Sequence, residues 1–400
     1  MSDQASERAP ARNREFPLLA YGFRPFFLVA ALFAALAVPL WLAAHTGAVA
    51  LPTPLPATLW HGHEMLFGYG TAVLAGFLLT ATPGWSGRPP VKGAALAALA
   101  VLWLAGRLMS FAGGSVPGIA AAIDLAFLPA LAVAIAPALQ AAPRRNLLFL
   151  PVLGLLVLAN LAVQVDALDV LPGAGSMALR ASLDLFVLLI ALVGGRIVPA
   201  FTASALAARG EAGRVRPFSA RDRLAIGSLA TLLLADLAGL PQIAGVVALA
   251  AALFNGWRLT GWGGSRSLRQ PILWVLHLGY AWLVAGLAWK GLADLTGFVL
   301  PADALHGLAI GAVGTMTLAV MSRATLGHTG RPLRAPRLIV ASYLLVSAAA
   351  IVRLAAAPAP AQLALPLLVL SGAFWSLAFA AFAIRLGPAL LQPRADGRPG

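Results

Sequence analysis

The residues best suited to chemistry stand together early in the chain. His61, His63, Glu64 and Met65 share the run Trp60-His-Gly-His-Glu-Met65, the densest polar cluster in a largely apolar sequence. Imidazole suits haem iron and copper, and a thioether favours Cu(I), so these side chains indicate a metal site in which Glu64 orients a ligand or transfers protons. Residues i and i+2 of a regular helix lie about 200° apart. Either the segment is not yet helical at His61, or the two rings serve different sites.

A sequence repeat places a second histidine in the register of the first. His63 and His306 each stand 24 residues before a Gly-Arg-Pro triplet. Both segments end in the pattern Ala-Thr-x-Gly-x-x-Gly-Arg-Pro, at 81–89 and 324–332. A third segment, around Arg196, matches their inner end but carries no histidine. Parallel repeats keep one orientation in a membrane, so we expect His63 and His306 to lie at the same depth.

The other histidines and two arginines offer further ligands or charges. His277 lies roughly 9 Å inside the inner end of its apolar stretch at 1.5 Å per residue, and it remains a candidate metal ligand. His45 and His328 fall at helix ends, where a single histidine usually bonds to interfacial water. Arg196 and Arg323 lie at inner ends, where they would bind lipid phosphates, cap a helix C-terminus or pair with an anionic group such as a haem propionate.

The elements that must position these residues are membrane-spanning helices. The 400 residues are 60% hydrophobic and 10% charged, with a mean hydropathy of +0.87, which excludes a soluble domain and a disordered chain. The absence of cysteine excludes disulfides, iron–sulfur clusters and covalently attached haem. The basic residues are scattered arginines, so nucleic acid is not an expected partner.

Apolar stretches of about 20 residues predict helices that cross the lipid bilayer. Twelve are present, at 25–44, 59–81, 91–110, 117–140, 146–165, 178–201, 222–240, 242–258, 271–294, 304–326, 336–356 and 363–386. The second, sixth and tenth run in one direction and carry the repeated pattern. We therefore predict an all-α polytopic membrane protein built from three pseudo-symmetric four-helix units around an axis along the membrane normal.

The charges between the stretches predict their orientation. With the N-terminus in the cytoplasm, 23 of the 28 Lys and Arg residues fall on the inner side, as the positive-inside rule requires. We expect a single transmembrane domain at 25–386, flanked by cytoplasmic segments at 1–24 and 387–400. No apolar region with a small-residue cleavage site precedes the first stretch, so residues 1–24 do not read as a cleavable signal peptide.

Long motifs, in order along nearly the whole chain, resemble the NnrS family. They are Tyr21-Gly-Phe-Arg-Pro-Phe-Phe-Leu28, Trp60-His-Gly-His-Glu-Met65, Gly195-Arg-Ile-Val-Pro-Ala-Phe-Thr202, His277-Leu-Gly-Tyr280 and Gly314-Thr-Met-Thr-Leu-Ala-Val-Met-Ser-Arg-Ala-Thr-Leu-Gly-His-Thr-Gly-Arg331. The resemblance implies a twelve-helix protein of the bacterial inner membrane that contains haem and copper, lowers nitrosative stress and accompanies denitrification. It implies a cellular context and leaves the reaction open.

The predicted architecture is also similar to the catalytic subunit of haem–copper oxidases and nitric oxide reductases. Those proteins have twelve helices in three arcs, with haem-ligating histidines on the second and tenth. In this chain the sixth stretch has no histidine, and the copper-binding histidines expected around the sixth and seventh are missing. The four-electron oxygen chemistry of that superfamily is therefore not expected here.

The first function hypothesis is a metal protein of the nitric oxide response. In it, His63 and His306 are the axial ligands of a haem b near the periplasmic face, and His61, His277 or Met65 supply ligands for copper. The protein would bind or detoxify nitric oxide or nitrosyl species, or protect cellular iron from them. Catalytic turnover, which needs an electron donor, is left open.

The alternative hypothesis is a proton-coupled transporter that exports a small molecule or a nitrosyl–iron complex. Asp184 or Glu64, both within apolar stretches, would bind the proton. Haem and copper content discriminates the two hypotheses.

Overall fold

The structure is a computed structural model that describes residues 16–213, 215–216 and 218–398, and this part of the chain contains helices and no strand. Most of the predicted segment at 1–24 lies outside the described residues.

The described residues form twelve spans, numbered here in chain order. They are α1 (Phe23–His45); α2 (Ala57–His63), η2 (Glu64–Gly70) and α3 (Thr71–Ser86); α4 (Gly93–Ala112); α5 (Pro117–Ala141); α6 (Phe149–Ala167); α7 (Ala174–Ala207); α8 (Ala220–Leu237); α9 (Pro241–Thr260); α10 (Pro271–Thr296); α11 (Pro301–Ala304), η6 (Gly307–Gly314) and α12 (Thr315–His328); α13 (Arg337–Ala356); and α14 (Ala361–Leu391). The twelve predicted spans are confirmed, with their ends within six residues of those expected.

Eleven of the twelve described spans are long and apolar enough to cross a membrane. The exception is α8, because four of its 18 residues are charged. Two of these charges are neutralised inside the bundle. Arg258 of α9 donates to Asp222 over 2.7 Å, and Lys290 of α10 donates to Asp236 over 3.0 Å. Since α8 packs between α7 and α9, these ion pairs allow a charged helix to take the seventh place.

Proline and glycine mark several helix ends. Pro117, Pro241 and Pro271 lie in the first turns of α5, α9 and α10, where a missing N–H costs no helical hydrogen bond. Gly87 and Gly297 follow α3 and α10 with φ of 71° and 65°, the left-handed conformation that ends a helix.

Spans 2 and 10 share an interruption that the other described spans lack. η2 and η6 are π-helical, and they begin at Glu64 and Gly307, which stand 243 residues apart. They directly follow His63 and His306, which have the same separation. Each π turn accommodates an extra residue and changes the direction in which the preceding side chains point. The sequence repeat is thus also a repeat of an unusual backbone.

The three-unit arrangement is visible in the walls of a central cavity of about 80 Å³, where spans 2, 6 and 10 meet. Most lining residues fall into triplets from equivalent positions, spaced 116 residues from span 2 to span 6 and 127 from span 6 to span 10. The triplets are Gly70, Phe186 and Val313; Val73, Leu189 and Met316; Leu74, Ile190 and Thr317; and Phe77, Val193 and Val320. Three parallel repeats around one axis produce this pattern, so the predicted pseudo-symmetry is confirmed.

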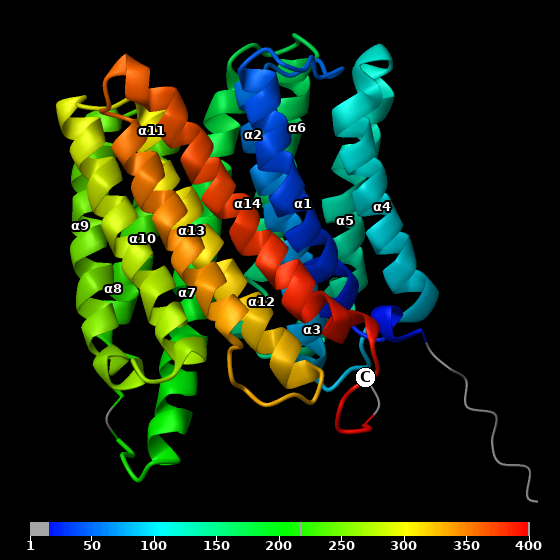
Figure 1. Cartoon of the computed structure of the whole chain (residues 1–400), viewed down its shortest axis with the longest axis vertical. Coiled ribbons are helices and arrows are strands. Elements are labelled where there is room, and N and C mark those ends of the chain that lie inside the picture. Colours follow the sequence, from blue (N-terminus) through cyan, green and yellow to red (C-terminus); the bar gives the residue numbers. More distant parts are fainter. Residues whose placement is uncertain (1–15, 214, 217, 399–400) are drawn as a thin grey trace, which may run out of the picture.

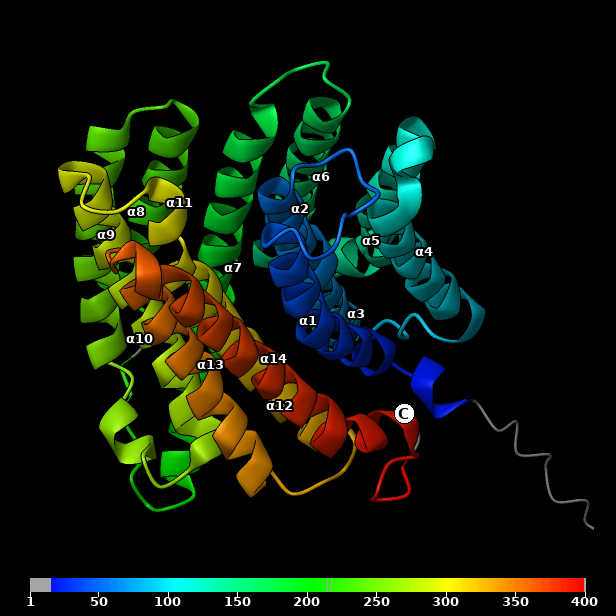
Figure 2. The same ribbon diagram turned by 45° about the horizontal axis from the view of Figure 1, so that its top comes forward.

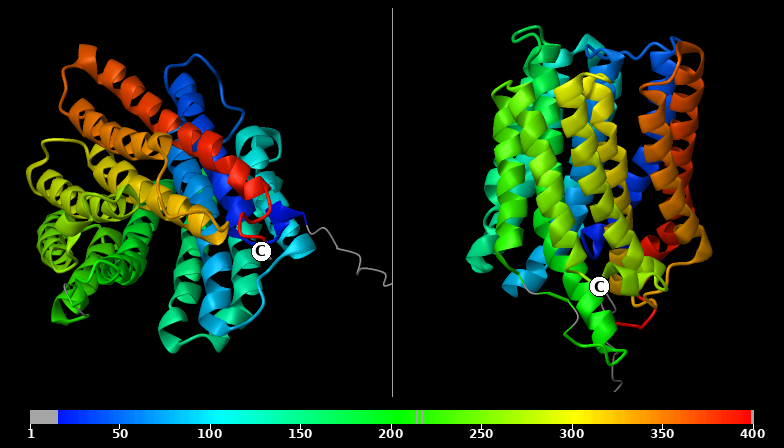
Figure 3. Two further views of the ribbon diagram at one scale, coloured as in Figure 1. Left: turned by 60° about the horizontal axis from the view of Figure 1, so that its bottom comes forward. Right: turned by 90° about the vertical axis from the view of Figure 1, so that its left-hand side faces the viewer.

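The units follow one another around that axis and close into a ring. α5 packs against α6, α9 against α10, and α14 returns to pack along α1. Figure 1 shows α14 crossing the bundle diagonally beside α1, and Figure 2 shows α7 between α6 and α8. The oblique view from below and the side view in Figure 3 show the spans running together through one bundle.

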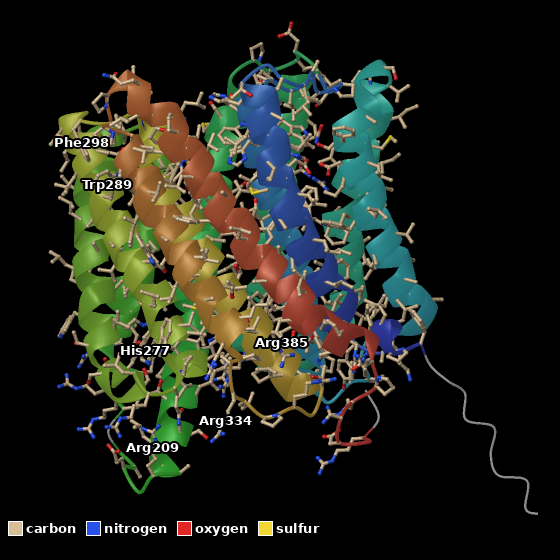
Figure 4. All side chains as sticks on the ribbon, in the orientation of Figure 1. Arg209, His277, Trp289, Phe298, Arg334 and Arg385 are labelled. Atoms are coloured by element: carbon tan, nitrogen blue, oxygen red, sulfur yellow. The ribbon has the colours of Figure 1, made fainter. Side chains whose placement is uncertain are left out.

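The two ends of the bundle differ in charge. Arg209, Arg334 and Arg385 lie toward the end at which α14 finishes, whereas Trp289 and Phe298 lie at the opposite end (Figure 4). We call these the arginine end and the aromatic end. The start of α1 is also at the arginine end, where Arg24 donates to the carbonyl oxygens of Leu390 and Gln392 at 3.0 and 2.7 Å.

Candidate functional site

Two imidazoles from spans 2 and 10 face each other near the aromatic end. The ring centroids of His61 and His306 lie 6.4 Å apart, and the ring planes differ by 11°. Metal–imidazole bonds of about 2.0–2.1 Å and a centroid-to-nitrogen distance of about 1.1 Å put two rings that share one metal atom roughly 6.3 Å apart. The 6.4 Å separation of the two centroids is close to this value.

One nitrogen in each ring is distinguished by its hydrogen bonding. Nδ1 of His306 lies 2.9 Å from the carbonyl oxygen of Ala302, which fixes Nδ1 as the donor and leaves Nε2 with a free lone pair. Nδ1 of His61 is buried and has no hydrogen-bond partner among the described residues. A buried ring nitrogen without a partner is costly unless something outside the chain completes it.

An aromatic column holds the His61 ring in place. The Trp41 ring stacks on His61 with centroids 4.2 Å apart and planes 27° apart, and it also stacks with His45 at 5.2 Å. Arg353 of α13 lies close enough to act electrostatically on both His61 and His306. Its guanidinium donates to Asp303 over 2.5 Å, so the pair has a cation at its side that is itself anchored.

His63 points into a different environment. Its Nδ1 lies 2.8 Å from Glu64, and its Nε2 lies 3.0 Å from the side-chain oxygen of Asn160 and 3.2 Å from Asp124. Arg107 of α4 donates to both oxygens of Glu64 at 2.7 Å and also pairs with Asp124. We call His63, Glu64, Arg107, Asp124 and Asn160 the buried ion network; each of them is at most 7% exposed.

The expectation that His63 and His306 face each other is therefore wrong. α2 is regular from Ala57 to His63, so residues two apart point in opposite directions, and the ring that meets span 10 belongs to His61. Of the two readings of the His-Gly-His run, the one with two rings in two sites matches the structure. Equal depth, which the repeat predicts, does not fix which way a side chain points.

The other predicted ligands lie apart from the His61–His306 pair. His277 lies toward the arginine end (Figure 4), where its Nε2 is 2.9 Å from the Thr202 hydroxyl. Met65 packs against the hydrophobic core. Arg196 donates to Asn146 over 2.9 Å, and the Arg323 guanidinium covers the Phe201 ring at 3.8 Å.

The number of possible ligand side chains limits which metals the pair could bind. In the described part of the chain, no group of three or more His, Asp or Glu side chains is placed to bind a metal ion. A structural zinc ion takes four protein ligands, and the described residues around the pair do not supply such a group. Haem iron and Cu(I) are the metals for which two imidazoles from the protein suffice.

The central cavity begins about two helical turns from the pair. His306 and Val313, which lines the cavity, are seven residues apart, roughly 10 Å at 1.5 Å per residue. The walls are apolar apart from the hydroxyl of Thr317, which bonds to the Tyr69 hydroxyl at 2.5 Å. An apolar cavity of this size stays dry and admits small apolar molecules.

The sequence analysis missed the roles of Trp41, Arg353 and Arg107. A signal for two of them was present, because Arg107 and Arg353 stand near the predicted outer ends of their apolar stretches and so depart from the charge asymmetry of the other arginines. Each proves to be bonded to a carboxylate inside the bundle. No comparable signal in the sequence pointed to Trp41, since tryptophan is common at membrane interfaces.

Comparison with known proteins gives one match. Residues 17–394 match the family model described as NnrS protein. The match covers nearly the whole chain and includes all twelve described spans. A search of curated proteins found no match.

Proposed function

The chain belongs to the NnrS family, which indicates a role in the nitric oxide response, and we propose that it serves this role as a metal protein with one metal atom between His61 and His306. The observation that carries the proposal is the geometry of the pair. Its 6.4 Å separation, near-parallel rings and unpartnered buried Nδ1 fit a metal with two opposed imidazole ligands. We propose haem b iron or copper as that metal.

The residues around the pair have defined tasks in this proposal. The Ala302 carbonyl holds His306 in the tautomer that presents Nε2, and the Trp41 ring keeps the His61 ring from rotating. Arg353 supplies positive charge beside both rings, which suits a cofactor that carries carboxylates. The bound metal would supply redox chemistry and an affinity for nitric oxide.

We propose that the central cavity admits nitric oxide from the bilayer. The molecule is small and uncharged, so it partitions into apolar space, and the cavity offers about 80 Å³ lined by apolar side chains. The cavity lies between the same two spans, 2 and 10, that carry His61 and His306. A ligand in it would lie between the two spans that carry the pair, roughly 10 Å from His306 along span 10.

We also propose that the arginine end is cytoplasmic and that the membrane is the bacterial inner membrane. The excess of arginine at that end is the pattern of cytoplasmic loops. In this orientation both chain ends face the cytoplasm, and the His61–His306 pair lies near the periplasmic face.

The test is metal and haem quantification on purified protein, together with optical spectra of the oxidised and reduced forms with and without nitric oxide. We expect stoichiometric metal in the native protein and its loss in both His61→Ala and His306→Ala. The matched control is His328→Ala, which removes a histidine at the arginine end and should leave the metal content unchanged. His63→Gln should also retain the metal, because His63 belongs to the buried ion network.

The outcomes separate the possible metals and functions. A haem spectrum lost in both alanine variants identifies haem b, and copper lost without any haem signal identifies copper. Full metal content in both variants, confirmed on monodisperse protein, contradicts the proposal. A native protein with neither metal also contradicts it, and flux that depends on a pH gradient in vesicles would then support the transporter alternative.

A further inference from the structure

A second set of buried charges lies in spans 6, 7 and 9, apart from the His61–His306 pair. It consists of Asp184 on α7, Asp236 on α8, and Lys290 and Asp294 on α10. The Lys290 ammonium donates to Asp236 over 3.0 Å and to Asp294 over 2.6 Å. Three carboxylates therefore share one cation, and this cation is already bonded to two of them.

Asp184 is the member without a donor. Its side chain is buried, with the residue 4% exposed, and neither carboxylate oxygen has a donor among the described residues. It lies within hydrogen-bond reach of the Asp236 carboxylate, whose Oδ2 also lacks a donor. Two ionised carboxylates in contact in an apolar interior repel each other, and each loses the water that would solvate it.

One proton resolves this arrangement. When either carboxyl is protonated, its O–H donates to the other carboxylate, two of the three unpartnered oxygens share this bond, and the net charge of the three aspartates and Lys290 rises from −2 to −1. Lys290 and Asp294 are the other charged groups that act on Asp184 from the neighbouring helices, and neither can supply this proton without breaking its own ion pair. The Lys290 ammonium already donates to two of the three carboxylates and takes the place that a metal ion bound between them would occupy.

We propose that Asp184 and Asp236 form a proton-binding site, a carboxylic acid–carboxylate pair inside the membrane that takes up and releases one proton. The route is indicated by exposure: the Asp236 side chain is 13% exposed, whereas Asp184 is sealed in the bundle. A proton from water adds to Asp236 and passes to Asp184, and it leaves by the same path, so no other bond forms or breaks. Lys290, bonded to both Asp236 and Asp294, stabilises the charge that remains when the proton leaves.

This site is independent of the proposed metal centre, since it shares no residue with it. It gives the protein a place to bind a proton whether the partner process is electron transfer or transport. Its failure would leave the metal proposal untouched, and the converse also holds.

The experiment is infrared difference spectroscopy on the intact purified protein with ¹³C-labelled aspartate, in H₂O and D₂O. We expect the carbonyl band of one protonated aspartic acid, shifted by the label and by deuterium. Asp184→Asn should remove this band, because the asparagine amide donates to Asp236 and replaces the proton. The matched control, Asp169→Asn, changes an exposed loop aspartate and should retain the band.

Several results would overturn the proposal. These are a native protein with no protonated aspartate band, a band that persists in Asp184→Asn, and a band that appears only after sodium is removed, which would indicate a cation site. Asp236→Asn is the second variant and should also lose the band. If neither variant folds, the labelled native protein decides the question by the presence or absence of the band.

Discussion

Removing the arginine at the centre of the buried ion network should show what the network contributes to stability. Arg107 is 7% exposed and bonds to both oxygens of Glu64 at 2.7 Å as well as to Asp124. The change Arg107→Met keeps a long apolar side chain of similar reach and removes the charge. It leaves two buried carboxylates without a guanidinium partner: Glu64 keeps His63 and Ser110, and Asp124 keeps His63, Asn160 and Gln164.

The magnitude follows from the burial of both partners. Removing one member of a buried ion pair costs about 3–5 kcal/mol, because the other charge stays in the interior without compensation. Glu64→Gln alone should cost less, about 1.5–3 kcal/mol, since Arg107 keeps its bond to Asp124. In the double variant the uncompensated Glu64 charge is absent, so its cost should fall below the sum of the two by about 0.5–3 kcal/mol.

The assay is reversible unfolding in mixed detergent micelles, followed by circular dichroism, for the native protein, both single variants and the double variant. Arg88→Met is the control, because Arg88 is exposed in the loop after α3 and its loss should change stability by no more than about 0.5 kcal/mol. Additive costs in the double variant, or an Arg107→Met cost as small as that of Arg88→Met, would refute the reasoning.

Three further changes test other parts of the fold. Tyr69→Phe removes the 2.5 Å bond between the hydroxyl on span 2 and that on span 10, and should cost about 0.5–1.5 kcal/mol in the same unfolding assay; an unchanged midpoint would mean that this bond adds nothing. Gly311→Ala puts a methyl group 2.6 Å from the Trp282 ring and should cost about 1–3 kcal/mol, whereas Gly154→Ala, in open space, should be close to neutral; equal effects would contradict the close packing at η6. Val193→Phe fills part of the central cavity and should abolish xenon occupancy in pressurised crystals, and xenon retained at full occupancy would place the gas elsewhere.

The spans were predictable because one physical requirement, the burial of apolar helices in lipid, determines where they lie. A helix in lipid must be apolar over about 20 residues, and every such stretch in the sequence is a helix in the structure. α8 was predicted from the apolar stretch at 222–240 although it carries four charges, and the distribution of basic loops agrees with a span there. The ion pairs of Asp222 and Asp236 that make it tolerable involve α9 and α10, and only the fold shows them.

The partner of each histidine was not predictable in the same way. The repeat identified spans 2 and 10 and the depth of His63 and His306, but the direction of a side chain depends on the rotation of its helix. η2 and η6 change that rotation next to the histidines by the angle of one extra residue, about 100°. A π turn leaves no mark in hydropathy, so the pairing of His306 with His61 required the structure.

Because α14 packs along α1, the three units form a closed ring around the axis. In such a ring any of the three units could come first in the chain. Arg24 at the start of α1 already bonds to the backbone at the end of α14, so a short linker there would join neighbouring ends. A circularly permuted chain, opened instead in the loop between α5 and α6 or between α9 and α10, should insert and assemble into the same bundle. The connectivity is then separable from the architecture, and each unit can be moved to either end of the gene.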